Sequence, residues 1–292
     1  MHFKDTVHSD LSPLGIFDSG YGGLTVFREI RQAMPQYDYL YLGDNARAPY
    51  GPRSFELVYE FTLQAVRYLF DMGCPLVILA CNTASAKALR TIQQRDLPRL
   101  FPPTAASPDG LPTRRVLGVI RPTVEAVGDI TRTRHIGIMA TQGTIRSHTY
   151  ELELAKLHPD ITVTGEACPM WVPLVENYEY DSPGADYFVQ KNVNHLLERD
   201  PQIDAIILGC THFPLLYHKI RACTPPQVHL MPQGEYVAHS LQDYLRRHPD
   251  IDARLSRGAT AQFLTTEQPG SFNDSATIFL DHPVAAQHIT LT

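Results

Sequence analysis

The chain has 292 residues, of which 43% are hydrophobic and 19% charged, as in soluble globular proteins large enough for two domains. Its formal net charge of −6 gives no electrostatic basis for binding nucleic acid, so we expect no nucleic-acid partner. No apolar run approaches the roughly 18 residues that span a bilayer, so we expect no membrane partner either.

Short apolar runs, typical of buried strands, alternate with longer stretches of helical periodicity. In chain order, we predict a strand at residues 14–17, a helix at 24–33, a strand at 39–42, a helix at 54–72 capped by Ser54, a strand at 76–80, a helix at 84–95, and strands at 116–120, 135–139, 161–164 and 203–208. This alternation predicts an α/β fold in which mostly parallel sheets are flanked by helices. The proline-rich stretch 101–115 is predicted to be an exposed loop without a function.

The five cysteines do not form the pattern of a disulfide framework or a zinc site. Their number is odd, their spacing is irregular and no Cys-x-x-Cys pair occurs. Residues 1–13 lack the basic start and apolar core of a secretory signal. We therefore expect free thiols, no bound metal and a cytoplasmic location.

Two of the cysteines occupy matching positions. The predicted strand at 76–80 leads into Cys81, and the strand at 203–208 leads into Cys210. Ligands bind at the carboxyl ends of strands in open α/β sheets, and the N-terminus of a following helix favours a thiolate. We therefore predict two similar lobes that face each other across a cleft, each with one cysteine.

Two opposed thiols suit the inversion of a stereocentre. A thiolate on one face removes a proton from a carbon acid, and a neutral thiol on the other face donates one, with the roles exchanged in reverse. A single cysteine is more often a small buried hydrophobe. The matching positions of Cys81 and Cys210 favour the catalytic interpretation.

The loops after other predicted strands carry groups that bind amino acids. Hydroxyls, amides and backbone N–H groups at residues 18–23, 43–51 and 140–144 suit carboxylates. Asp18 or Glu176 is expected to hold an ammonium group. Asp18 and His212 are candidates to tune the two thiols, and the alternative for His212 is a core histidine bonded to backbone.

Four motifs follow one another along the chain. They are Asp18-Ser19-Gly20 with Gly22-Gly23-Leu24-Thr25-Val26, Gly43-Asp44-Asn45-Ala46-Arg47 with Pro49-Tyr50-Gly51, Ala80-Cys81-Asn82-Thr83-Ala84-Ser85-Ala86, and Leu208-Gly209-Cys210-Thr211-His212-Phe213-Pro214-Leu215-Leu216. Together they resemble the glutamate racemase family of the aspartate/glutamate racemase superfamily, from about Leu14 to about Leu280. The resemblance implies a cofactor-independent interconversion of L-glutamate and D-glutamate, which supplies D-glutamate for bacterial peptidoglycan synthesis.

The resemblance also implies roles for individual residues. Cys81 and Cys210 match the two catalytic cysteines, one for each enantiomer, and Asp18 and His212 match residues that assist them. Glu176 is implied to support His212. The implied substrate-binding residues are Asp18, Ser19, Tyr50, Gly51, Asn82, Thr83, Thr141, Thr144, Thr211 and His212.

The implied architecture is a pair of pseudo-symmetric α/β lobes with the active site in the cleft between them. The first lobe would comprise residues 14–120 and 227–292 and carry Cys81. The second would comprise residues 121–226 and carry Cys210. Relatives commonly form homodimers, so a homodimer is implied as well.

Three segments depart from the family pattern. The loop at 101–115 is longer, Met231-Pro232-Gln233-Gly234 replaces an acidic-serine-glycine sequence, and Arg121-Pro122-Thr123 replaces a Pro-Gly pair. We expect none of them to touch the cysteine motifs. They put the packing of the loop and the dimer geometry in question rather than the reaction.

Other functions fit the sequence less well. A nicotinamide dehydrogenase would use the glycines after the first strand together with Asp44, but Thr25 occupies the third glycine position of the fingerprint. A pyridoxal-phosphate racemase needs a Schiff-base lysine, and none of the five lysines lies at a predicted strand end. A two-cysteine aspartate or hydantoin racemase and a catalytically lapsed binding protein stay open as alternatives.

Overall fold

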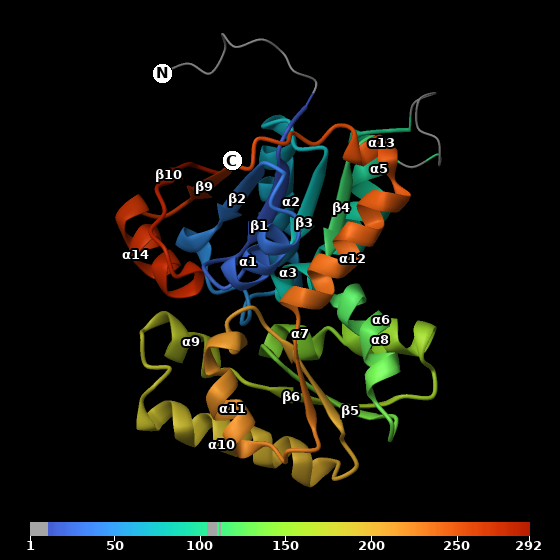
Figure 1. Cartoon of the computed structure of the whole chain (residues 1–292), viewed down its shortest axis with the longest axis vertical. Coiled ribbons are helices and arrows are strands. Elements are labelled where there is room, and N and C mark those ends of the chain that lie inside the picture. The colour runs from blue at the N-terminus through green and yellow to red at the C-terminus, as the bar shows by residue number, and fades with distance from the viewer. Residues whose placement is uncertain (1–10, 104–109, 111) are drawn as a thin grey trace.

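The computed structural model describes residues 11–103, 110 and 112–292, which fold into two parallel β-sheets flanked by helices (Figure 1). The larger sheet has six strands in the order β10-β9-β2-β1-β3-β4, and the smaller has four in the order β6-β5-β7-β8. All neighbouring strands in both sheets run parallel. The predicted fold class is confirmed.

The larger sheet is built from the first part of the chain and from its end. Its strands are β1 (Leu14–Asp18), β2 (Tyr39–Gly43), β3 (Leu76–Leu79), β4 (Arg115–Gly118), β9 (Ala261–Thr265) and β10 (Ala286–His288). The helices in these two segments are α1 (Leu24–Ala33), η1 (Asn45–Arg47), α2 (Phe55–Asp71), α3 (Asn82–Lys87), α4 (Leu89–Thr91), η2 (Ile92–Asp96), α5 (Leu97–Leu100), α12 (Gly234–Arg247), α13 (Pro249–Asp252) and α14 (Pro269–Leu280).

The smaller sheet is built from the middle of the chain. Its strands are β5 (His135–Ala140), β6 (Thr162–Ala167), β7 (Ala205–Gly209) and β8 (His229–Pro232). The helices of this segment are α6 (Ile120–Ile130), α7 (Gln142–Arg146), α8 (Thr149–Leu157), α9 (Trp171–Glu176), α10 (Pro183–Arg199), η3 (Phe213–Leu216) and α11 (Tyr217–Cys223). The chain thus passes between the sheets twice, after β4 and after β8.

Both faces of each sheet are buried. In β1, Leu14 and Ile16 belong to one hydrophobic core, whereas Phe17 belongs to another core together with residues of α2. In β7, Ile206 belongs to the first core and Ile207 to a third. Because successive side chains of a strand point to opposite faces, burial on both faces requires the continuous apolar runs seen in the sequence.

Most predicted elements are confirmed, and the helix at 24–33 agrees with α1 at both ends. Ser54 caps α2 by accepting a hydrogen bond from the Leu57 N–H at 3.3 Å. The single helix predicted at 84–95 is wrong, because the chain breaks at Ala88 into α3, α4 and the π-helical η2. Ala88 is fully buried, and packing at this position overrides the helix propensity of the sequence.

Other predictions need correction or stay untested. The strand predicted at 116–120 ends at Gly118, and Ile120 begins α6, because an apolar run alone does not distinguish a buried strand from a buried helix. β8, β9 and β10 were not predicted. Part of the proline-rich loop, residues 104–109 and 111, lies outside the described residues.

The boundary between the predicted lobes differs from the sheet topology at one strand. β8 pairs with β7 in the smaller sheet, although its residues fall in the range assigned to the first lobe. The chain crosses to the larger sheet only at α12, which packs against α1. The division into lobes otherwise stays a prediction. Within the described ranges, no helix is both long and apolar enough to cross a bilayer.

The aromatic contacts of Phe27 tie α1 to the larger sheet. Its ring centroid lies 5.6 Å from that of Tyr39, 5.9 Å from that of Tyr41 and 5.5 Å from that of Phe263, all edge-on. We predict that Phe27→Ala lowers the free energy of unfolding by roughly 3–5 kcal/mol, since it leaves a cavity among these rings. Phe55→Ala, at a side chain that is 47% exposed, is the control and should change it by less than about 1 kcal/mol in the same urea titration. Equal losses would contradict this account of the core.

Candidate active site

Cys81 and Cys210 line one cavity of about 150 Å³. Cys81 follows β3, Cys210 follows β7, and each residue is 6% exposed. Ser19, Thr141 and Cys168, which directly follow β1, β5 and β6, line the same cavity. The cavity therefore lies where the carboxyl ends of strands from both sheets meet, as expected for a ligand site in α/β folds.

Cys81 is the N-cap of α3, and its surroundings favour the neutral thiol. Its Sγ donates a hydrogen bond to Ser19 Oγ at 3.3 Å and accepts one from the Ala84 N–H at 3.4 Å. Burial, together with the negative charge of Asp18, raises the pKa of the Cys81 thiol to about 12. At neutral pH this sulfur therefore carries a proton that it can donate.

The Asp18 carboxylate is fully buried behind Ser19. Its Oδ2 accepts a hydrogen bond from the Gly20 N–H at 2.9 Å, whereas Oδ1 has no hydrogen-bond partner among the described residues. Burial raises the pKa of Asp18, and the charge of His212 opposes this rise. Gly23 allows the close approach of α1, because a Cβ there would lie 2.4 Å from Asp18 Cβ.

Cys210, His212 and Glu176 form a row. His212 Nδ1 lies 3.9 Å from Cys210 Sγ, and His212 Nε2 lies 3.0 Å from Glu176 Oε1. Burial alone would lower the pKa of His212, but its hydrogen bonds to Cys210 and Glu176 outweigh burial and raise the pKa to about 10. His212 is therefore an imidazolium at neutral pH, and its positive charge lies next to the Cys210 sulfur.

The second half of the site differs from the sequence prediction in one respect. Cys210 is followed by the four-residue 3₁₀-helix η3 and only then by α11, so no α-helix begins directly at this cysteine. The positive charge next to Cys210 comes from His212 instead. Gly22 makes room for this histidine, because a Cβ at Gly22 would lie 2.4 Å from His212 Nδ1 and 2.4 Å from Thr211 Oγ1.

Three threonine hydroxyls from both parts of the chain meet at the site. Thr83 Oγ1 lies 3.0 Å from Thr141 Oγ1 and 3.3 Å from Thr144 Oγ1, and the last two lie 3.1 Å apart. Each hydroxyl can donate one hydrogen bond and accept others. The cluster can therefore turn its donors toward an anionic group without bringing a charge into the cavity.

Tyr50 and Gly51 come from the loop after β2 and line the cavity. The Tyr50 hydroxyl donates a hydrogen bond to Asp44, which also binds Arg47 at 2.7 Å and accepts a hydrogen bond from Thr266 at 2.9 Å. Asp44 is thus used within the protein. This removes the acidic residue on which the nicotinamide dehydrogenase alternative depended.

Asn82 and Thr211 also line the cavity. Asp18, Thr83 and Thr144 do not line it, but Asp18 directly precedes the lining residue Ser19, and Thr83 and Thr144 contact the lining residue Thr141. The sequence analysis missed Cys168, which lines the cavity, and Tyr150 and Gln233, which bind the Asn82 side chain. Cys168 gave little signal, because β6, with the sequence TVTGEA, is largely polar and only partly buried, and the strand predicted there ended at Thr164. The expectation that the departing segment 231–234 avoids the cysteine motifs is wrong, since Gln233 contacts the residue next to Cys81.

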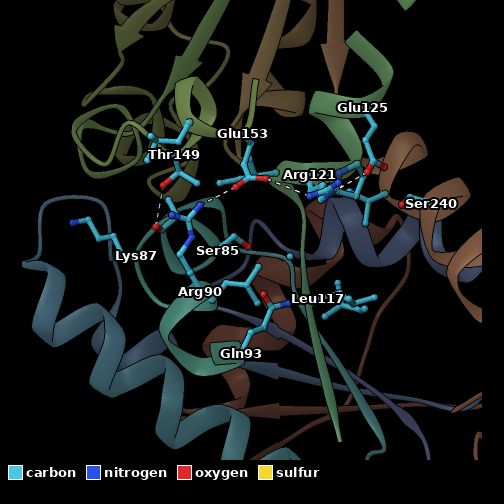
Figure 2. A pocket seen from close by; sticks show the side chains of 18 of the residues that line it. Ser85, Lys87, Arg90, Gln93, Leu117, Arg121, Glu125, Thr149, Glu153 and Ser240 are labelled. Atoms are coloured by element: carbon cyan, nitrogen blue, oxygen red, sulfur yellow. Dashed lines mark hydrogen bonds and ion pairs between the residues drawn. The ribbon is translucent and has the colours of Figure 1, made fainter. Parts of the chain in front are cut away.

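A second cavity of about 550 Å³ lies at the other end of α3 (Figure 2). Glu153 of α8 sits between Arg90 at 2.9 Å and Arg121 at 3.6 Å, so these ion pairs join α4 to α6 and α8. The Thr149 hydroxyl donates a hydrogen bond to the Ala86 carbonyl at 3.1 Å. Among residues 11–103, 110 and 112–292, no cluster of three or more His, Cys, Asp or Glu side chains is arranged to hold a metal ion.

Comparisons with known proteins agree with this geometry. The family model described as Asp/Glu/Hydantoin racemase matches residues 22–232. A glutamate racemase of Paracoccus denitrificans is 40% identical over 281 residues, which cover 93% of this chain and 97% of the relative.

Solved structures give the same assignment. The crystal structure of a glutamate racemase of Bacillus anthracis matches with a TM-score of 0.84 and 33% identity, covering 96% of this chain and 98% of the other. A glutamate racemase of Francisella tularensis, solved in complex with D-glutamate, matches with a TM-score of 0.81 and 27% identity, covering 96% and 98%. The chain therefore belongs to the glutamate racemases of the Asp/Glu/Hydantoin racemase family.

Proposed function

We propose that this protein interconverts L-glutamate and D-glutamate by proton transfer at the α-carbon, without a cofactor, and that Cys81 and Cys210 are the two acid–base groups. The observation that carries the proposal is the pair of thiols, one from each sheet, in a single cavity. The surroundings of the two sulfurs differ in charge, with Asp18 near one and the His212 imidazolium near the other. One base and one acid are therefore ready at the same pH.

In the proposed resting state, Cys210 is a thiolate paired with His212, and Cys81 is a thiol. The Cys210 thiolate takes the α-proton of the substrate and becomes a thiol, and the α-carbon keeps the electron pair of the broken C–H bond. Cys81 gives its proton to the opposite face of that carbon and becomes a thiolate. The other enantiomer reacts with the roles exchanged, and proton exchange with water restores the resting state.

The groups around the thiols support a place for each polar group of glutamate. We propose that the hydroxyls of Thr83, Thr141 and Thr144 bind a carboxylate and that Asp18 or Glu176 holds the ammonium group. Ser19, Tyr50, Gly51, Asn82, Thr211 and His212 complete the proposed substrate contacts. The buried Oδ1 of Asp18, which has no partner within the described ranges, supports its part in this arrangement.

We further propose that the protein acts in the cytoplasm as a homodimer and supplies D-glutamate for peptidoglycan. Membership of the glutamate racemases supports this setting. We also propose that the chain divides into two lobes, one around each sheet, with the cavity between them.

Purified protein given L-glutamate without added cofactor tests the function. We predict loss of the circular dichroism signal of the substrate and, in heavy water, entry of deuterium at the α-carbon. Cys81→Ser and Cys210→Ser should each lower kcat by about 10³-fold or more, because a hydroxyl is far harder to ionise than a thiol.

Other outcomes point to the alternatives. Racemisation of aspartate or of a 5-substituted hydantoin such as 5-methylhydantoin, but not of glutamate, would assign the cysteine pair to another carbon acid. The parent protein could also fail to racemise any of these compounds. If its Cys81→Ser/Cys210→Ser variant then still bound glutamate, the result would favour the alternative of a catalytically lapsed binding protein. A Cys81→Ser protein with the parent's rate would exclude the two-cysteine mechanism.

The charge difference between the thiols predicts unequal reactivity. With iodoacetamide at pH 7, Cys210 should be alkylated faster than Cys81, because the thiolate is the nucleophile and the His212 imidazolium lies next to the Cys210 sulfur. Peptide mass spectrometry of the time course measures both rates in one sample. Equal exposure of the two residues, 6% each, provides the internal control for access. Faster labelling of Cys81 would reverse the proposed resting state.

The role of His212 predicts a change in the pH–rate profile. In His212→Asn, the thiolate of Cys210 loses its positive neighbour, so the acidic limb of kcat/KM should move to higher pH and the maximum should fall by roughly 10²-fold. Glu176→Gln is the matched control. It leaves the contact between His212 and Cys210 in place, so the acidic limb and the maximum of kcat/KM should change less than in His212→Asn. Profiles that overlay would refute the role of His212.

A further inference from the structure

The side chain of Gln233 occupies a buried position where the two parts of the chain meet. Gln233 is 3% exposed and lies between the end of β8 in the smaller sheet and α12, which packs on α1 beside the larger sheet. Its backbone is therefore part of the second passage between the sheets. Val119, between β4 and α6, is part of the first passage.

Gln233 links these two passages directly. Its Nε2 lies within hydrogen-bonding distance of three acceptors, which share its two hydrogens: the Val119 carbonyl at 3.2 Å, Thr123 Oγ1 at 3.0 Å and the Tyr150 hydroxyl at 2.8 Å. The Thr123 hydroxyl itself donates to the Val119 carbonyl at 3.1 Å. Gln233 and Thr123 belong to the two segments, 231–234 and 121–123, that depart from the family pattern. The departures therefore contact each other behind the active site.

Gln233 also belongs to a closed ring of hydrogen bonds with Asn82 and Tyr150. Asn82 Nδ2 donates to Gln233 Oε1 at 2.6 Å, Gln233 Nε2 donates to the Tyr150 hydroxyl at 2.8 Å, and this hydroxyl donates to Asn82 Oδ1 at 2.8 Å. Each member donates once and accepts once within the ring. The amide of Gln233 cannot be turned over, because its oxygen would then face the Val119 carbonyl oxygen.

The ring touches the chain next to both cysteines. Asn82 directly follows Cys81, and a Cβ on Gly209, the residue before Cys210, would lie 3.2 Å from the Tyr150 hydroxyl. All three ring members are buried, with exposures of 2% for Asn82, 1% for Tyr150 and 3% for Gln233. Breaking one hydrogen bond would therefore leave its partners unsatisfied away from water.

We propose that Gln233 is a positioning residue for the racemisation. Its hydrogen bonds to the Val119 carbonyl and to the Asn82 side chain fix how Cys81 and Cys210 approach the substrate from opposite faces. This role rests on the function proposed above. Proton transfer depends steeply on the distance and alignment of the two sulfurs, whereas Asn82 is only one of several proposed substrate contacts, which include the threonine hydroxyls. Loss of Gln233 should therefore affect kcat more than KM.

Two substitutions of similar size separate positioning from packing. Gln233→Met removes both polar atoms, and Gln233→Glu keeps an acceptor for Asn82 but sets a carboxylate against the Val119 carbonyl. At pH 8, both should lower kcat by about 10²-fold and change KM by less than about threefold. For Gln233→Glu the deficit relative to the parent should shrink as pH falls toward 6, because burial favours the protonated carboxyl, which regains a donor. For Gln233→Met it should stay constant.

The matched control is Glu153→Gln, which weakens ion pairs between α4, α6 and α8 at the larger cavity (Figure 2). This substitution weakens contacts between the parts of the chain that form the two sheets, but it does not alter the hydrogen-bonded ring of Asn82, Tyr150 and Gln233. We therefore expect kcat to stay within about twofold of the parent. Tyr150→Phe, which serves if a Gln233 variant fails to fold, should lower kcat by about tenfold. Combined with Gln233→Met it should add little, because one ring is already broken.

Steady-state kinetics from pH 6 to 9, with melting temperatures of all variants, decide between the outcomes. Gln233 variants with the parent's kcat, or an equal loss in Glu153→Gln, overturn the positioning role while the racemase function stands. A Gln233→Glu deficit with the same pH dependence as that of Gln233→Met also overturns it. A parent protein that does not racemise glutamate overturns the proposed function and this role together.

Discussion

The meeting of the carboxyl edges of two parallel sheets is the constraint on which the site depends. Neither sheet alone carries both thiols, so their separation is set by contacts between the two parts of the chain. These contacts are close and specific. The Thr25 hydroxyl of α1 donates a hydrogen bond to the Thr211 carbonyl at 2.9 Å, and Gly22 has no room for a Cβ against Thr211 and His212. A small change in this contact would therefore alter the geometry of any proton transfer across the cavity.

Within this frame, burial and charge act differently on two identical functional groups. Cys81 lies in a buried site beside a buried carboxylate, and Cys210 lies beside an imidazolium that Glu176 supports. The same low dielectric strengthens both effects, because charges interact more strongly away from water. The protein thus differentiates the thiols by their neighbours and needs no difference in exposure, which is 6% for each.

The local parts of this structure could be read from the sequence, and the long-range contacts could not. Strands such as β1 and β7 are continuous apolar runs because both of their faces are buried, and the residues after them mark the cavity. β10 is short and largely exposed, so it leaves no such signal. Gln233 was visible only as a departure from a family pattern, since its bond to Asn82 joins residues 151 positions apart. The roles of Cys210, His212 and Glu176 were inferred by resemblance. Their arrangement in a row could not be predicted, because the fold brings Glu176 next to His212 from a distant part of the sequence.

The unequal surroundings of the two thiols have a thermodynamic consequence for a glutamate racemase. The enantiomers have equal free energies in water, so kcat/KM must be the same for both, however different the two cysteines are. The asymmetry therefore cannot favour one product at equilibrium. It can appear only as differences in kcat that are matched by differences in KM, so that the enantiomer which turns over faster is also the one that saturates the enzyme at higher concentration.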